Sequence, residues 1–163
     1  MTAQIAETLI YQGEQVALLT NPLDMYFELG GHHPGFQSTS SALWRGYVGS
    51  WELINDRLYL LALDGVLETG EDASLESVFP GHPDRVFAHW YSGTLRIPQG
   101  RQLEYVHMGY ASSFERDVLL TLQNGVVVHK EVRHNGQAPK DAPEGYGIGA
   151  MTVWPAHRDR DDA

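Results

Sequence analysis

Hydrophobic and polar residues alternate in short runs along most of the chain, and a period of two is typical of strands that bury one face. Glycine, proline, asparagine or aspartate separates these runs, as is typical of turns. The runs predict strands within residues 8–19, 43–54, 57–63, 86–91, 94–97, 101–108 and 114–133. We therefore predict an antiparallel meander of about eight to ten strands.

Two dipeptides strengthen this prediction because they match tight β-hairpin turns. Asn55-Asp56 separates two of the runs, and Asn124-Gly125 lies between arms rich in valine and leucine. A type I′ turn needs positive φ at both central residues, which asparagine, aspartate and glycine tolerate well. Gly13 divides the first run in a similar way, so this run is predicted to form two short strands.

Helix signals are few. Residues 21–31, NPLDMYFELGG, predict one short helix, with Asn21 as N-cap, Pro22 in the first turn and Gly30 at the C-terminal end. Ser74 in SLESVF is suited to begin a further helical turn. The predicted fold is therefore mainly β, or β-rich α+β: a curled antiparallel meander or β-barrel-like sheet with one short helix.

Length and composition predict one domain followed by a tail. The 163 residues suit a single hydrophobic core. Residues 1–133 form the predicted β-rich domain. Residues 134–163 hold four glycines and three prolines and are predicted to form a C-terminal loop or tail.

The charge of the chain narrows the choice of partners. The formal net charge is −10, and no lysine or arginine precedes Arg45. Such a surface repels phosphate groups, so nucleic acids and anionic membranes are excluded as expected partners. A basic protein partner or a small molecule is compatible with it.

The sequence also predicts where the protein is found. It has no apolar run of about 18 residues and no secretory signal at its N-terminus. Cysteine is absent, which excludes disulfides and thiolate metal sites. We therefore expect a soluble cytoplasmic protein.

Candidate binding residues gather in the run TSSALWRGYVGSWE, residues 39–52. Alternation places Arg45, Tyr47 and Trp51 on one face, with Gly49 between the two aromatic residues. This face is predicted to meet the core. One interpretation is a ligand pocket in which the guanidinium holds a carboxylate or phosphate beside an aromatic wall. The other is a structural ion pair between Arg45 and an acidic neighbour, with the aromatic rings in the core.

Two histidines lie within aromatic runs. They are His89 in FAHWYSG and His107 in LEYVHMGY, where His107 shares a strand face with Tyr105. Each histidine suits a general base, a donor to a ligand, or a purely structural role. Tyr110 follows in a loop that suits the rim of a pocket. The candidate ligand-binding residues are Arg45, Tyr47, Trp51, His89, Tyr105, His107 and Tyr110.

Common cofactor and metal patterns are absent from the sequence. It contains no G-x-G-x-x-G, no P-loop, no G-x-S-x-G and no H-E-x-x-H pattern. We therefore predict no cofactor and no metal. An enzyme would have to use His89 or His107 with a carboxylate such as Glu104 or Glu52. Glu104 and His107 leave opposite faces of an ideal strand, so that pair would need a bulge.

Three sequence motifs resemble motifs of a known protein family. The runs WRGYVGSWE, WYSGTLRIPQG and LEYVHMGY resemble those of a family of small bacterial proteins whose activity is uncharacterised. The resemblance covers roughly residues 8–130 and implies a single compact domain in the bacterial cytoplasm. It implies no reaction, cofactor or catalytic residue.

Three classes of function remain open at this point. The first is an acidic binding protein without catalysis, similar to an immunity protein or antitoxin, that blocks a basic partner. The second is a small-ligand-binding β-barrel with an Arg/His/aromatic pocket. The third is an enzyme with a histidine acid/base.

Overall fold

The computed structural model describes residues 3–106, 108–142, 146–148 and 151–153. As predicted, the protein is mainly β. One mixed sheet has the strand order β2-β1-β3-β4-β8-β7-β6, with β5 beside β4, and β9 pairs with β10 in a second sheet. The strands are β1 (Glu7–Tyr11), β2 (Glu14–Leu18), β3 (Tyr47–Ile54), β4 (Arg57–Gly65), β5 (Val86–Phe87), β6 (Gly93–Glu104), β7 (Ser113–Gln123), β8 (Val126–His134), β9 (Tyr146–Ile148) and β10 (Met151–Val153).

The predicted hairpin turns are confirmed. The β3–β4 turn has φ values of 52° at Asn55 and 62° at Asp56, and the β7–β8 turn has 51° at Asn124 and 82° at Gly125. Positive φ at both central residues is the type I′ pattern, whose twist matches that of the flanking strands. Gly13, with φ of 81°, lies in the turn between β1 and β2.

The helical segments are also confirmed. Helix α1 (Pro22–Glu28) has proline in its first turn, and Gly30 follows its end with φ of 97°. Asn21 stands at the N-cap, but its side chain makes no capping hydrogen bond. Helix α2 (Leu75–Val78) begins at Ser74, which forms a capping box with Ser77. No helix in the described part of the chain is long and apolar enough to cross a membrane.

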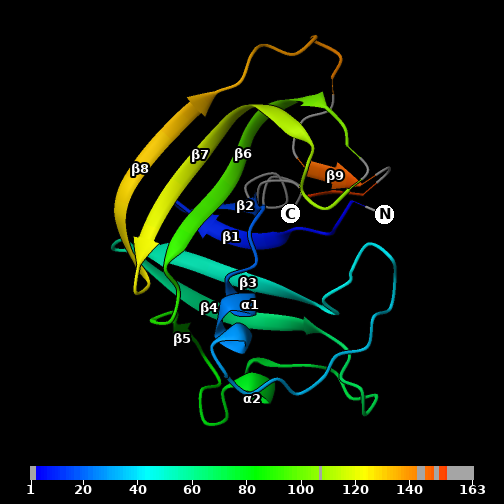
Figure 1. Ribbon diagram of the computed structural model, residues 1–163, viewed down its shortest axis with the longest axis vertical. Coiled ribbons are helices and arrows are strands. Elements are labelled where there is room, and N and C mark those ends of the chain that lie inside the picture. The colour runs from blue at the N-terminus through cyan, green and yellow to red at the C-terminus, as the bar shows by residue number, and fades with distance from the viewer. Residues whose placement is uncertain (1–2, 107, 143–145, 149–150, 154–163) are drawn as a thin grey trace.

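The predicted fold class is confirmed, but the sheet is mixed rather than purely antiparallel. Strand β1 pairs in parallel with β3, so α1 and the following loop connect strands on either side of β1. Over the described residues the sheet is curled but not closed. Strands β4 and β8 share one register position, Arg57 opposite Val126, and β8 then curves away from the β3–β4 hairpin (Figure 1). The edges β2 and β6 meet where Leu19 N–H donates to Arg96 O, at 2.8 Å.

Several predicted strand boundaries differ, and at two of them glycine changes the backbone direction. Residues 43–46 form a turn, in which Gly46 has φ of 80° and its N–H donates to Leu43 O. The predicted strand at 86–91 is reduced to β5. The runs 94–97 and 101–108 join into β6, in which a register shift beside Gly100, with φ of 82°, replaces the expected turn.

The beginning of the predicted tail is held against β7 and β6. Asn135 N–H donates to Glu115 O at 2.8 Å, and Ala138 N–H donates to Glu115 Oε2 at 2.9 Å. Arg101 Nη1 donates to Ala142 O at 2.8 Å. Residues 135–142 therefore contact the first residues of β7 and the later part of β6.

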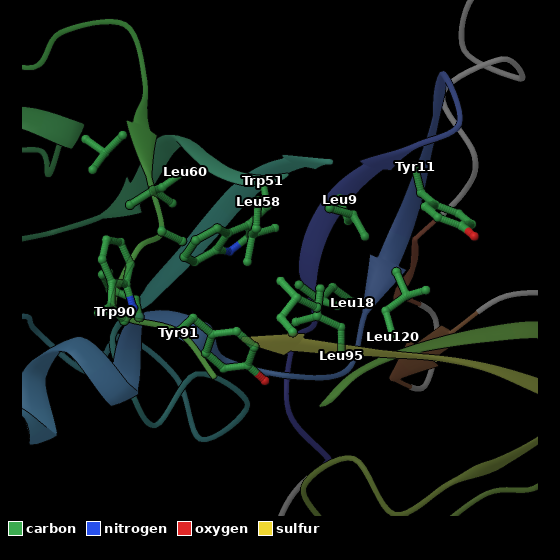
Figure 2. Close-up of a cluster of buried hydrophobic side chains, with 14 of the residues drawn as sticks. Leu9, Tyr11, Leu18, Trp51, Leu58, Leu60, Trp90, Tyr91, Leu95 and Leu120 are labelled. Atoms are coloured by element: carbon green, nitrogen blue, oxygen red, sulfur yellow. The ribbon is translucent and has the colours of Figure 1, made fainter. Parts of the chain in front are cut away.

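The main core lies on the inner face of the curled sheet. Tyr47, Gly49 and Trp51 of β3 are buried, which confirms the predicted face of this strand. Figure 2 shows Trp51 in the same cluster as Leu9 of β1 and Leu18 of β2. The inner face of β7 adds to this core through side chains that are at most 2% exposed, namely Val118, Leu120 and Leu122.

Candidate functional site

A cavity of about 490 Å³ opens beside this core, at one end of the curled sheet. It lies where the β1–β2 turn, the β3–β4 turn and the start of β8 come together, and we call it the hairpin cavity. Its apolar wall is formed by Tyr11, Leu53, Leu120, Val127 and Val128. Figure 2 shows Tyr11 at one end of the core cluster, with its hydroxyl directed away from the leucines of β1 and β2.

The separation of β8 from β4 accounts for this cavity. Thr121 is opposite His129 and Leu122 is opposite Val127, so Val128 is an extra residue in β8 and forms a bulge. A bulge bends its strand and increases the local twist. β8 therefore follows β7 rather than β4, and the inner face of the sheet is open at this point.

Polar groups surround the opening. Gln12, Asn55 and Asp56 come from the two tight turns, and His129 and Lys130 come from β8. The Lys130 ammonium lies 5.6 Å from the centroid of the Tyr11 ring, within the range of a cation–π contact. The site therefore combines an apolar wall with several donors and one carboxylate.

The structure brings four of the predicted site residues together elsewhere, around the carboxylate of Glu7. Arg45 Nη2 donates to Glu7 Oε2 at 2.7 Å, and Trp51 Nε1 donates to Glu7 Oε1 at 3.0 Å. The Arg45 guanidinium lies 5.5 Å from the Tyr47 ring centroid. Tyr110 joins the group through the carbonyl of Ile5, which accepts from both its hydroxyl and Arg45 Nη2.

Burial controls the electrostatics of this group, which we call the Glu7 cluster. Burial raises the pKa of Glu7, and the charge of Arg45 and the N–H donors of Gly49 and Trp51 act in the opposite direction. Burial also raises the pKa of Tyr47, whose hydroxyl donates to Asp24 Oδ1 at 2.5 Å. The acceptors bound by Arg45 Nη2 thus belong to the protein itself. Arg45 Nε is buried without a hydrogen-bond partner among the described residues.

The other predicted site residues lie apart from this cluster or outside the description. His89 is exposed and packs edge-on against Trp90, with 5.6 Å between ring centroids. Tyr105 is 40% exposed, and His107 lies outside the described residues. None of the described candidates lines the hairpin cavity. Ligand binding by these seven residues stays a prediction.

Sequence reasoning missed Glu7 and the hairpin cavity. A signal for Glu7 was present, because alternation along β1 places it on the same face as Leu9 and Tyr11, and all three are buried. The cavity had no such signal. Its residues come from four separate stretches of the chain and meet only through the pairing of distant strands.

In the described part of the chain, no group of three or more histidine, aspartate or glutamate side chains is placed to hold a metal ion. Comparison of the sequence with protein-family models and with curated proteins, and of the structure with solved structures, gives no match. The resemblance of the three motifs to small bacterial proteins therefore stays a prediction.

Proposed function

We propose that the protein binds a small, partly apolar molecule in the hairpin cavity. The observation that carries this proposal is the cavity itself, with a volume of about 490 Å³ and an apolar wall continuous with the core. Binding pockets for small molecules are typically about 300–1,000 Å³ and mostly apolar, with a few polar groups.

The exposed part of the apolar wall supports this proposal. Leu53 and Val127 are only partly buried and Val128 is 59% exposed, so apolar surface borders the cavity. Removing apolar surface from water is favourable. An apolar ligand would cover this surface, so its binding should also raise the melting temperature of the protein.

The test uses N-phenyl-1-naphthylamine, a neutral apolar dye whose fluorescence rises when it leaves water. We expect saturable binding of one dye per chain. Val127→Phe should fill part of the cavity and weaken binding at least tenfold. Val132→Phe is the matched control, because Val132 lies on the same strand, is 41% exposed and does not line the cavity.

Two results would contradict the proposal: the absence of saturable binding, or equal affinity of wild type and Val127→Phe. Circular dichroism shows whether each variant is folded. If Val127→Phe does not fold, Val128→Trp replaces it, because Val128 borders the cavity from an exposed position and tolerates a larger side chain more readily.

A second candidate function, binding of a partner protein, is favoured by exposed apolar side chains on two loops. Trp44 is 50% exposed and Met108 is 47% exposed. Gln4 links the loops, since its Oε1 accepts from Trp44 N–H and its N–H donates to Gly109 O. Aromatic residues and methionine are enriched at protein interfaces.

A photo-crosslinking amino acid in place of Trp44 tests this second function in cells that make the protein naturally. A true partner should be captured there and not from position 29, where Leu29 is 69% exposed at the C-terminal end of α1. The purified partner should then lose affinity for Trp44→Asp. Capture of the same proteins from both positions would contradict this function.

A further inference from the structure

The orientation of Lys130 bears on what kind of molecule the hairpin cavity binds. Lys130 is opposite Leu120 in the β7–β8 ladder. Residues directly opposite each other on antiparallel strands point to the same face of the sheet. Because Leu120 is 1% exposed in the core, Lys130 lies on the same face, although its own side chain is exposed.

The charge of Lys130 is not neutralised by an ion pair. No carboxylate lies within ion-pair distance of its ammonium among the described residues. Its recorded contact is with the Tyr11 ring, at 5.6 Å. A cation–π contact at an exposed site contributes only about 0.5–1 kcal/mol, so it orients the ammonium without satisfying its charge.

The other polar groups at the cavity favour an anion as well. The amides of Gln12 and Asn55 and the imidazole of His129 are able to donate hydrogen bonds. Asp56 carries the one carboxylate among the described lining residues. Its backbone carbonyl accepts from Val127 N–H at 2.7 Å, which holds this turn against β8. Donors therefore outnumber anionic groups here, although the whole chain has a net charge of −10.

An inward-pointing lysine has a second known use, which is to discourage edge-to-edge association of strands. That role requires a charge near the open edge of β8 and does not require a cavity. The ammonium lies above the ring of Tyr11, which is part of the apolar wall of the cavity. The cavity therefore offers space for the apolar part of a ligand beside this charge. The two roles predict different behaviour toward small anions.

We propose that the hairpin cavity binds an apolar anion, such as an aromatic or medium-chain carboxylate, whose charged group pairs with Lys130. The apolar body of the ligand would pack against Leu53, Leu120 and Val127. This inference rests on the proposed function of the cavity and adds the charge of its ligand. Hydrogen bonds between an ammonium and a carboxylate or sulfonate are among the stronger ones in proteins.

The test compares two dyes that differ in one group: N-phenyl-1-naphthylamine and its 8-sulfonate. The wild type should bind the sulfonate at least fivefold more tightly than the neutral dye, and added salt should reduce this preference. Lys130→Met should abolish the preference, so that the ratio of the two affinities falls to about one. Lys130→Arg should retain the preference. Lys140→Met is the matched control, because it removes the chain's other lysine, which lies outside the cavity.

The outcomes separate the two proposals. Equal binding of both dyes by the wild type, or a sulfonate preference that survives in Lys130→Met, overturns the anion inference and leaves the cavity proposal standing. Loss of the neutral dye in Val127→Phe supports the cavity. Sulfonate binding that needs Lys130 but is insensitive to Val127→Phe overturns the anion inference, since it places the anion outside the cavity.

Discussion

Glu7 and Arg45 form a buried ion pair, with 2.7 Å between Glu7 Oε2 and Arg45 Nη2 and side-chain exposures of 0% and 8%. The pair joins strand β1 to the turn that precedes β3. The same carboxylate accepts from Gly49 N–H at 2.7 Å and from Trp51 Nε1 at 3.0 Å. One carboxylate therefore connects the guanidinium, the β3 backbone and the largest buried ring of the core.

Removing one partner of this pair should destabilise the protein more than removing both. Glu7→Leu leaves the buried guanidinium without its counter-charge, and we expect a loss of about 3–5 kcal/mol in the free energy of unfolding, measured with urea. Glu7→Leu combined with Arg45→Met should recover part of this loss. Recovery should be incomplete, because Gly49 N–H and Trp51 Nε1 still lack their acceptor.

The exposed pair Glu131–Arg133 provides the control for this measurement. Its atoms are 3.7 Å apart, and its side chains are 60% exposed at Arg133 and 50% at Glu131. Glu131→Leu should change the free energy of unfolding by at most about 1 kcal/mol. A similarly small effect of Glu7→Leu, or strictly additive effects in the double variant, would show that the interaction between Glu7 and Arg45 does not stabilise the fold.

Arg96 should be sensitive to replacement even by lysine. Its Nε donates to Asp117 Oδ1 at 2.9 Å, and its Nη1 and Nη2 donate to the carbonyls of Tyr110 and Ser112 at 2.7 and 2.9 Å. Lysine has no planar fork and cannot reproduce these three directions. We expect Arg96→Lys to lower the free energy of unfolding by about 2–3 kcal/mol in urea titrations.

Arg57→Lys is the control for Arg96→Lys, because Arg57 is exposed at the start of β4. It should change the free energy of unfolding by less than about 0.5 kcal/mol. If both variants are equally stable, the three hydrogen bonds of Arg96 do not determine the stability of the loop between β6 and β7.

The parts of the fold that were predictable from the sequence are those with local causes. Asn124-Gly125 specifies its own turn, because the backbone conformations that these two residues tolerate also set the twist of the hairpin. The parallel pairing of Thr8 with Ser50 has no local cause. It depends on which distant strand offers a matching buried face, and alternation gives the face of a strand without giving its neighbour.

In the candidate site, too, features with a local cause were predictable from the sequence, and features that depend on distant strands were not. The predicted face of Arg45, Tyr47 and Trp51 does meet the core, but alternation could not show that the partner of Arg45 is Glu7 of β1. The hairpin cavity depends on the bulge at Val128, and its wall includes Tyr11 from a different hairpin. A single extra residue in one strand is not visible in a pattern of hydrophobic and polar positions.

The attachment of residues 135–142 should depend on pH through Glu115. Backbone N–H groups of Arg101 and Ala138 donate to its carboxylate and lower its pKa. A lowered pKa in the folded state means that the ionised carboxylate stabilises the fold. This stabilisation is present above the ordinary pKa of glutamate and is lost as the pH falls through the lowered value.

Nuclear magnetic resonance can follow this titration at the Ala138 amide. Its signal should move with a midpoint below the ordinary glutamate pKa of about 4.3. Glu115→Gln should remove this transition and, at neutral pH, speed cleavage by a lysine-specific protease after Lys140 relative to Lys130. Glu131→Gln is the control and should change neither. A midpoint at or above the ordinary value would contradict the proposed role of Glu115.

Gly125 should be far less tolerant of alanine than Gly13, although both have nearly the same φ, 82° and 81°. A Cβ at Gly125 would lie 2.5 Å from Ala88 O, whereas a Cβ at Gly13 would meet nothing within 4 Å. Gly13→Ala therefore measures backbone strain alone, about 1–2 kcal/mol. Gly125→Ala adds the clash with a backbone atom, and its loss of unfolding free energy should exceed that of Gly13→Ala by at least about 1 kcal/mol. Equal losses would mean that the segment around Ala88 shifts without a loss of unfolding free energy. The contact between the β7–β8 turn and this segment would then not fix the position of β8.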